Sequence, residues 1–451
     1  MVNYWSTTMK LFTLLVLLTL GAAVFAQTPE AKVLATANSI SFTADDLSQQ
    51  GKTIYLRSNE ILAANRSKFL EQTIAEQLIK TEADARGMSS AKLLADEFAK
   101  IPLPSDERIA EVVEMNRAAL AGLSPAEARE RVVQEMLREP SAKAEAELIE
   151  RLKTKLKFTA GKDINDAALK PSDVVFTINA KPFTAADFNE MNRVALNDVD
   201  VHIYEEIRGD LEDAILNRLI ITEAAAQKLD SSELVKREIS DKTVDGSERE
   251  RALLIAALQE RLFKKHNVNL LLPEPPALVL NVSADDDPAV GPVNAKVTIV
   301  TFIDYQCSAC AGFSPVIKKV ASEFGQRVRL VVRDYPLMSI HPNAFNAALA
   351  ANAAGRQGKY FEYGDLLYAD QDSLDDASLI KYAEQLGLDA NKFRSDMTDP
   401  KNAEEVRKDM TDGDSYGVSG TPTIYINGVK HHGLSETRFR QAVEKALGGV
   451  K

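Results

Sequence analysis

Cysteine is scarce in this sequence, with only two in 451 residues. Both lie in one short motif, Cys307-x-x-Cys310. The chain is therefore no disulfide-stapled scaffold, because a bridge across so small a loop restricts the unfolded chain little. A structural zinc site needs four ligands, no second cysteine pair exists, and the adjacent His431 and His432 fit the usual ligand spacing poorly. A redox-active pair is the favoured interpretation, with inert structural thiols or a metal site as the alternatives.

Positive charge is also in short supply. Lys and Arg number 54 against 66 Asp and Glu, which gives a net charge of −12. This balance argues against nucleic acid as a partner. Glycine and proline occur at ordinary levels, so the composition is that of a folded globular protein, and the length predicts two or three domains.

Long hydrophobic runs are missing except near the start of the chain. Lys10 is followed by an apolar run over residues 11–25, which ends in small residues suited to cleavage after Ala26. We expect residues 1–26 to be a signal peptide, with Met9 as an alternative start and an uncleaved anchor as the alternative function. No cysteine follows the run, which argues against a lipoprotein. The predicted location is periplasmic or otherwise exported, where disulfides form.

The two cysteines stand where a strand pattern gives way to a helix pattern. The apolar, β-branched residues 297–303 are typical of a buried strand. After them, apolar residues recur at helical spacing, at Phe313, Ile317, Val320 and Phe324. A helix start favours a thiolate at Cys307, and Cys310 lies one turn on, close enough to form a disulfide. The pattern indicates a redox pair that needs no cofactor and no metal.

Two stretches before residue 271 repeat each other. Residues 33–47 align with residues 174–188, with Thr36, Asn38, Phe42, Thr43 and Asp46 matching Thr177, Asn179, Phe183, Thr184 and Asp187. The same offset of 141 residues (177 − 36) carries residues 78–83 onto residues 219–224. Two separate blocks in one register indicate a tandem duplication.

Each repeat is predicted to begin with a short extended pair and a capped helix. Thr43 and Thr184 are the expected N-caps, with Asp46 and Asp187 in the acidic first turns. A long amphipathic helix follows in each repeat, and Gly87 closes the first one. Further helices are expected over residues 106–120, 125–137, 142–156 and 253–263.

This pattern resembles the N-terminal chaperone module of the periplasmic SurA and parvulin-type foldase family. There, an Asn-Gly turn and a Thr-x-x-Asp/Glu-Leu sequence lead into helices that cradle unfolded chains. Here Asn38-Ser39 and Asn179-Ala180 replace Asn-Gly, and no prolyl isomerase domain is visible. The resemblance implies an arm that binds clients. The alternatives are that its apolar stripes are only core, or that the arm joins copies of this chain into an oligomer.

The predicted organisation is a mostly α-helical tandem arm followed by an α/β thioredoxin-like domain with a helical insertion. The boundaries are residues 27–160 and 161–271 for the repeats, 272–292 for a proline-rich linker and 293–451 for the catalytic domain. The density of prolines holds the linker partly extended, so we expect the arm and the catalytic domain to move separately. In the last domain, a second strand is expected over residues 328–333, a third from Pro422 to an Asn427-Gly428 turn, and a closing helix over residues 436–447.

The catalytic domain closely resembles the DsbA family of exported thiol-disulfide oxidoreductases. The matching segments are Asp304-Tyr-Gln-Cys307-x-x-Cys310, Asp334-Tyr-Pro-Leu337, His341-Pro342, Gln357-Gly-Lys-Tyr-Phe361 and Gly417-Val-Ser-Gly-Thr-Pro-Thr423. The separation of 112 positions between Cys310 and Pro422 (422 − 310) fits the family's helical insertion. The resemblance implies that Thr421-Pro422 is a cis peptide beside the cysteines and that the Thr421 backbone pairs with an extended client. It also implies that Cys307 attacks, Cys310 resolves, and a membrane redox partner restores the pair.

Two departures from that family affect the chemistry. Ser308-Ala309 replaces the Pro-His of strongly oxidising members, so we expect a less extreme Cys307 pKa and a milder oxidant. A buried Glu six residues before the first cysteine is replaced by Thr301. Asp304 is the nearest acid and either substitutes for that Glu or is a surface charge. His341 precedes a proline and is expected to cap a helix.

The sequence therefore predicts an exported protein thiol-disulfide oxidoreductase, an oxidase or an isomerase, that acts on unfolded or misfolded clients. The alternative is a chaperone whose cysteine pair only senses the redox state.

Overall fold

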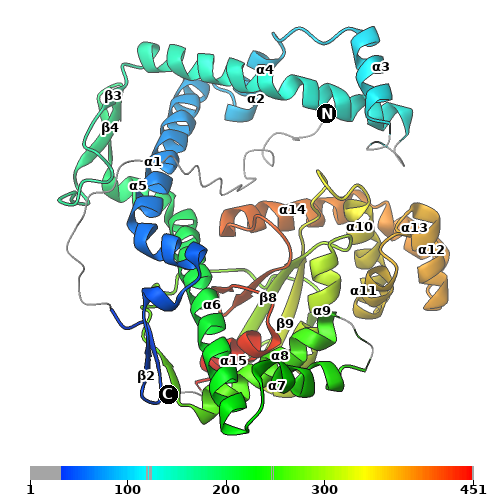
Figure 1. Cartoon of the computed structure of the whole chain (residues 1–451). Coiled ribbons are helices and arrows are strands. Elements are labelled where there is room, and N and C mark those ends of the chain that lie inside the picture. The colour runs from blue at the N-terminus through cyan, green and yellow to red at the C-terminus, as the bar shows by residue number, and fades with distance from the viewer. Residues whose placement is uncertain (1–31, 118–119, 121–123, 245, 247, 449–451) are drawn as a thin grey trace. The chain divides into compact units, whose positions relative to one another are not determined.

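The computed structural model describes residues 32–117, 120, 124–244, 246 and 248–448. The predicted signal peptide, residues 1–26, lies outside them. The described chain forms two compact units, one of Arg57–Val199 and one that joins residues 32–56 to residues 200–448. The N-terminal region is mostly helical, and the C-terminal domain is a mixed sheet covered by helices, as the sequence predicts (Figure 1).

The helical region is built from long helices and two small sheets. Two of its helices, α1 and α6, contribute residues to both units. Its elements are β1 (Ala35–Ala37), β2 (Ile40–Phe42), α1 (Gln49–Ala85), α2 (Ser90–Phe98), α3 (Asp106–Met115), α4 (Pro125–Lys155), β3 (Thr159–Ala160), β4 (Val174–Ile178), β5 (Lys181–Thr184), α5 (Ala185–Met191), α6 (Arg193–Ala226), α7 (Ser231–Glu238), α8 (Glu248–Lys265) and β6 (Val268–Leu270).

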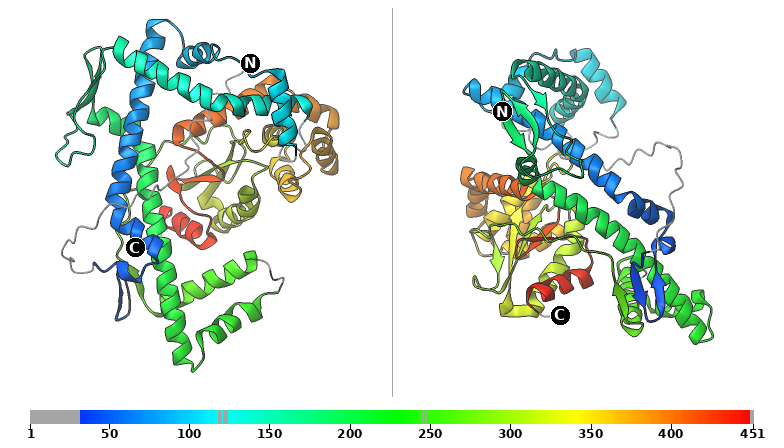
Figure 2. Two further views of the ribbon diagram at one scale, coloured as in Figure 1. Left: turned by 45° about the horizontal axis from the view of Figure 1, so that its top comes forward. Right: turned by 90° about the vertical axis from the view of Figure 1, so that its left-hand side faces the viewer.

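Helix α4 corrects the prediction of two helices over residues 125–137 and 142–156. It runs unbroken through Pro140 (Figures 1 and 2). A proline inside a helix removes one hydrogen bond of the ladder, but it does not always end the helix. Here Ser124 and Glu127 form a capping box at the start, and the buried Leu148 and Leu152 anchor the part after the proline. The sequence interpretation also missed the short helices α2 and α7.

The local geometry of the two repeats agrees at the aligned positions. Thr43 and Thr184 each form a capping box, with Asp46 and Asp187 respectively, so both predicted caps are confirmed. Asn38 and Asn179 share a φ of 50°, in the left-handed region. Asparagine tolerates this conformation at a tight turn, which explains how the hairpins form without the Asn-Gly pair.

Each hairpin is completed by a strand that follows the helices of a repeat. Strand β3, which ends the first repeat, pairs with β4 at the start of the second. Strand β6, which ends the second repeat, pairs antiparallel with β1 at the start of the first, with Thr36 opposite Asn269. The repeats therefore exchange their closing strands, a feature that sequence spacing alone did not indicate.

The C-terminal domain is a five-stranded sheet with helices on it. The strand order is β11-β10-β8-β9-β7, in which β8 and β9 are parallel and the other pairs are antiparallel. Helix α9 packs against β9, α11 and α15. The elements are β7 (Ala289–Val290), β8 (Val297–Ile303), α9 (Ser308–Phe324), β9 (Val328–Asp334), α10 (Ala344–Gly355), α11 (Tyr360–Ala369), α12 (Asp376–Gln385), α13 (Ala390–Met397), α14 (Pro400–Tyr416), β10 (Thr423–Ile426), β11 (Val429–His431) and α15 (Glu436–Ala446).

The proline-rich linker joins this sheet from Val279 on. Val279 bridges to Val429, and the Leu280 N–H donates to the Gly428 carbonyl at 2.9 Å. Strand β7 then pairs with β9. The free linker is therefore shorter than the prolines alone indicate.

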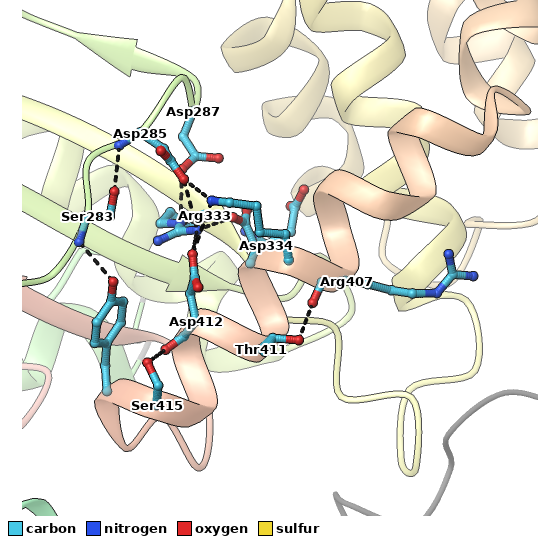
Figure 3. A network of polar contacts seen from close by, with 12 residues as sticks. Ser283, Asp285, Asp287, Arg333, Asp334, Arg407, Thr411, Asp412 and Ser415 are labelled. Atoms are coloured by element: carbon cyan, nitrogen blue, oxygen red, sulfur yellow. Dashed lines mark hydrogen bonds and ion pairs between the residues drawn. The ribbon is translucent and has the colours of Figure 1, made fainter. Parts of the chain in front are cut away.

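Arg333 on β9 also holds the linker in place (Figure 3). Its side chain is fully buried. The guanidinium lies 2.9 Å from an Asp287 oxygen on the linker, 2.5 Å from Asp409 and 2.7 Å from Asp412, both on α14. A buried charge is tolerated only when it is paired, so this cluster fixes the linker, β9 and α14 to one another.

Candidate active site

The cysteine pair lies at the junction between a buried strand and a helix, as predicted. Strand β8 ends at Ile303, and Cys307 occupies the N-cap position of α9. Asp304 to Gln306 form the connecting turn, with the Cys307 N–H donating to the Asp304 carbonyl at 3.2 Å. Both thiols are free in this structure, which therefore represents the reduced protein.

The Cys307 thiol is set up as a nucleophile. Its pKa is lowered to about 5, first by a hydrogen bond from the Cys310 side chain and then by Thr421 and the backbone N–H groups of Ala309 and Cys310, while burial opposes the shift. Thiols at helix starts have pKa values of roughly 3.5 to 7.5. The sulfur also lies 3.2 Å from the Thr421 carbonyl oxygen. Cys307 is therefore a thiolate at neutral pH.

Cys310 is the opposite case. Its side chain is 1% exposed, and burial raises its pKa far above the ordinary value, with further increases from the hydrogen bond to Cys307 and from the charge of that thiolate. Cys310 is thus a protonated thiol, held behind the reactive sulfur. This asymmetry matches the predicted roles of attacking and resolving cysteine.

Thr421 and Pro422 face the pair, as the sequence predicts. The Thr421-Pro422 peptide is cis. Strand β10 begins directly after it, at Thr423, and pairs with β8, so the sheet fixes the distance between this turn and the cysteines. Pro422 and Cys310 line the same small cavity.

Asp304 is buried, so its interpretation as a surface charge is wrong. Its side chain is fully enclosed. One carboxylate oxygen accepts from the Leu337 N–H at 2.8 Å and lies 2.7 Å from His341 Nδ1, and the other accepts from the Gln306 N–H at 2.7 Å. Asp304 therefore ties the turn before Cys307 to the loop after β9. That Asp304 substitutes for the family's buried Glu remains a prediction.

The helix-cap prediction for His341 is also wrong. Helix α10 begins after Asn343, which has no side-chain cap bond, and the His341 ring contacts Asp304 instead. The buried Asp304 carboxylate needs hydrogen-bond partners, and the His341 ring contacts this carboxylate instead of the first turn of α10. The sequence contained His341-Pro342 and Asp304, but nothing in their spacing indicated that they meet.

Two tyrosines behind Cys310 were missed as site residues by sequence reasoning. Tyr360 and Tyr368 on α11 line a cavity with Cys310, together with Thr301 on β8, a position already identified from the sequence. Tyr360 and Tyr368 are eight residues apart, a spacing that places both on one face of a helix. This spacing could have identified the two tyrosines as neighbours from the sequence.

Within the part of the chain that the structure describes, no group of His, Cys, Asp and Glu side chains is arranged to hold a metal ion. Burial lowers the pKa of His431 to about 4, and its ring packs against Phe439.

Among the same described residues, no helix has the length and hydrophobicity needed to cross a bilayer.

Comparison with known families matches residues 283–445 to the family described as Thioredoxin. The C-terminal region is therefore a thioredoxin-like domain that carries a Cys-x-x-Cys pair. The match begins at Ser283, on the linker segment that the structure joins to the sheet. It does not extend to the tandem arm, whose likeness to SurA modules remains a prediction.

Curated relatives include the Na(+)/H(+) antiporter NhaA 3 of Salinispora tropica, 41% identical over 156 residues that make up 35% of this chain and 24% of that protein. NhaA 1 of Salinispora arenicola is 41% identical over 175 residues, 39% of this chain and 27% of that protein. The matched stretch thus spans about a quarter of these relatives' length.

Solved structures similar to this chain include a thioredoxin-like oxidoreductase from Silicibacter pomeroyi, at 26% identity, 37% coverage of this chain, 95% coverage of that chain and a TM-score of 0.34. Alpha-DsbA1 from Wolbachia pipientis is 21% identical and covers 37% and 94%, with a TM-score of 0.34. The catalytic domain of Proteus mirabilis ScsC is 20% identical and covers 38% and 93%, with a TM-score of 0.33.

Proposed function

We propose that this chain is an exported protein thiol-disulfide oxidoreductase that acts on unfolded or misfolded client proteins. The observation that carries the proposal is the opposed state of two neighbouring thiols. Cys307 has its pKa lowered to about 5 at a helix start, and Cys310 is buried and protonated one turn on. An inert structural pair has no need of such asymmetry, whereas stepwise disulfide exchange requires it.

The exchange follows from this geometry. The Cys307 thiolate attacks a client disulfide and forms a mixed disulfide, releasing one client thiolate. Cys310 then loses its proton and attacks the Cys307 sulfur, which closes the Cys307–Cys310 disulfide and releases the second client thiolate. The client gains two electrons and the enzyme loses two. In the reverse direction, a client thiolate attacks the enzyme's disulfide and the client is oxidised.

Thr421 and Pro422 supply the docking edge for the client in this proposal. An extended client segment pairs with the Thr421 backbone as an added strand, which brings a client sulfur to Cys307. The carbonyl oxygen of Thr421 lies 3.2 Å from the Cys307 sulfur. A client segment that is hydrogen-bonded to the Thr421 backbone would therefore lie within reach of that sulfur.

The arm is proposed to hold clients. A groove of about 680 Å³ lies between α3 and α4, lined on its apolar side by Leu103, Ile109, Ala126 and Val133. Leu103 is 73% exposed, so its side chain is accessible to a client. A Leu103→Glu variant should bind reduced, unfolded client less tightly while the exchange chemistry at Cys307 stays unchanged. Equal client affinity of this variant and the unaltered protein would count against the groove.

The reduction potential of the pair tests the direction of exchange. It would be measured against a glutathione buffer, with the two thiols trapped by alkylation. A potential near roughly −120 mV means an oxidase, and one near roughly −270 mV means a pair kept reduced by a membrane partner for isomerase or reductase work. A pair that does not form a disulfide under any of these conditions would refute the enzyme proposal.

A double Cys307→Ala, Cys310→Ala variant separates the enzyme from a chaperone that only senses redox state. Loss of function in cells is expected. Full retention of function would favour the chaperone. Gel filtration of the whole protein and of the Leu103→Glu variant tests whether the arm serves self-association instead.

A further inference from the structure

Behind Cys310 lies a cavity of about 30 Å³. A space of roughly 10 to 15 Å³ is enough for one water, so this cavity is large enough to hold one. Cys310 and Pro422 line it from the active-site side, and Thr301, Tyr360 and Tyr368 line it from the sheet and α11. It therefore joins the buried thiol to polar groups that the exchange steps described above do not use.

Three of the hydroxyl groups on this cavity, those of Thr301, Tyr360 and Tyr368, are buried and have no hydrogen-bond partner among the described residues. The Thr301 side chain is 2% exposed, and its Oγ1 is buried without a partner. The Tyr368 hydroxyl is likewise buried and unpaired, and its ring packs 5.0 Å from that of Tyr305. Buried hydroxyls are nearly always satisfied, commonly by ordered water. Three such groups on one cavity beside a thiol favour an ordered water there.

Ser314 and Lys318 of α9 also line the cavity. The Lys318 ammonium is partly exposed and pairs with Asp365 at 2.5 Å, so this part of the lining reaches the surface of α9 and α11. The cavity lining thus includes both a thiol with almost no solvent exposure and a side chain whose ammonium lies at the surface.

The exchange reaction needs a route for the Cys310 proton. Burial keeps the Cys310 proton on its sulfur, yet Cys310 attacks only as a thiolate. Burial also raises the pKa of Tyr368, and the charge of a Cys310 thiolate raises it further, so these two groups lie close enough to interact. Tyr368 stays a neutral hydrogen-bond donor throughout.

We propose that Thr301 and Tyr368 are positioning residues for proton transfer at Cys310, holding a water in this cavity that carries the proton between the buried thiol and solvent. The inference rests on the proposed exchange function and assigns its slow proton step to named side chains. The Cys310 proton passes to the water, the water releases a proton toward Lys318, and the thiolate left on Cys310 attacks the Cys307 sulfur. In the reverse direction, Cys310 leaves as a thiolate and takes a proton by the same route.

The test uses the full-length reduced protein and the small disulfide 5,5′-dithiobis(2-nitrobenzoate), followed by stopped flow. The Cys307 thiolate releases one thionitrobenzoate in a phase proportional to reagent concentration. Cys310 then releases the second in a phase independent of that concentration. We expect Thr301→Val and Tyr368→Phe each to slow the second phase about tenfold or more, the scale of general acid–base effects, with the first phase unchanged.

Three controls isolate the proton step. Cys310→Ser should abolish only the second phase, which assigns it. Thr301→Ser keeps the hydroxyl and should restore the rate. Tyr382→Phe removes a tyrosine hydroxyl that bonds Asp370 outside the cavity, and should change neither phase. The second phase of the unaltered protein should also slow in D₂O more than that of the Thr301→Val variant.

The outcomes separate the inference from the proposed function. If the unaltered protein releases only one thionitrobenzoate per chain, Cys310 does not resolve and the proposed function fails, taking the inference with it. If it releases two, but the second phase is equally fast in both single variants, the inference alone is overturned. Because the first phase reports an intact Cys307 site in the same trace, misfolding of either variant is recognised, and the other variant then decides.

Discussion

Two aligned carboxylates of the arm and two buried carboxylates of the thioredoxin-like domain have pKa values shifted in opposite directions. In the arm, Glu82 is 1% exposed and lies 2.7 Å from Lys155, whose hydrogen bond lowers the carboxyl pKa. The aligned residue of the second repeat, Glu223, has its pKa lowered by Lys265 in the same manner. In the thioredoxin-like domain, burial raises the pKa of Asp334 to about 7 and also raises that of Asp409.

The difference shows what polar burial contributes in each region. In the arm, Glu82 and Glu223 each pair with a lysine of their own, and this pair recurs at the same place in both repeats, so it serves the architecture. In the thioredoxin-like domain, several acids share one buried guanidinium, Arg333, and titratable groups are left with displaced pKa values. Displaced pKa values are typical of sites that carry chemistry, and the cysteine pair lies in this domain.

The largest expected effect comes from removing the reactive thiol of the thioredoxin-like domain, compared with a change in the arm. Cys307→Ser should reduce disulfide exchange to the uncatalysed rate, because serine cannot attack a disulfide. Glu223→Gln, a change in the arm, should leave the rate of attack by Cys307 unchanged. Dithiothreitol-driven reduction of insulin by each variant measures this. Comparable losses in both variants would show that the chemistry is not confined to the thioredoxin-like domain.

Arg333→Met tests the shared cation. It leaves Asp409 and Asp412 without their buried partner, which should cost about 3 to 5 kcal/mol of unfolding free energy. The control is Arg440→Met, which removes the partly exposed pairs with Glu323 and Glu436 and should cost at most about 1 kcal/mol. Chemical denaturation gives both values. A small effect at Arg333 would mean that the cluster is not needed to hold the linker and α14.

The pH dependence of stability should have opposite signs in the two regions. An unfolded Asp has a pKa near 3.9, so Asp334, at about 7 when folded, stabilises fully below about pH 4 and loses this contribution as the pH rises through 7. In the arm, Glu238 has its pKa lowered to about 2, first by a hydrogen bond from Lys242, so its contribution is present above about pH 4.3 and is lost as the pH falls through 2.

Hydrogen exchange by mass spectrometry, corrected for intrinsic rates, measures the local stability of each region separately. Between pH 5 and 8 we expect protection to fall in β9 and α14, and to stay level in α7 and α8. Asp334→Asn should flatten the fall. A parallel change in both regions would contradict the assignment of these shifts to separate local environments.

The smallest expected effect is the difference in stability cost between the aligned carboxylates of the two repeats. Glu82→Gln should cost about 2 kcal/mol and Glu223→Gln about 1 kcal/mol, because the Glu82 side chain is 1% exposed and that of Glu223 is 12% exposed. Chemical denaturation of the two variants measures the difference. A larger cost at Glu223 would show that the two repeats are not supported in the same way.

The sequence predicted the features whose causes lie within a few residues. The strand before Cys307, the helix after it, the caps at Thr43 and Thr184, and the Asn427-Gly428 turn all follow from local patterns, and the structure has them. Local sequence decides these elements because capping, turn geometry and apolar periodicity act over one or two turns.

The features that the sequence did not reveal depend on residues far apart in the chain. Strand β6 reaches β1 across more than two hundred residues, and no local pattern names its partner. Asp304 meets His341, and Arg333 meets Asp287 and Asp409, only after the sheet has formed. Each of these contacts pairs a buried charged group or an unpaired strand edge. It therefore depends on the tertiary fold and not on the secondary-structure propensity of the local sequence.

The most direct test of the central claim is the pH dependence of alkylation of the reduced protein by iodoacetamide, with the labelled residue identified by mass spectrometry. The account predicts that Cys307 alone reacts, with a midpoint near pH 5, because its thiolate is stabilised by Cys310 and Thr421. Reaction of Cys310 at a similar rate, or a Cys307 midpoint near the ordinary thiol pKa of about 8.5, would contradict it.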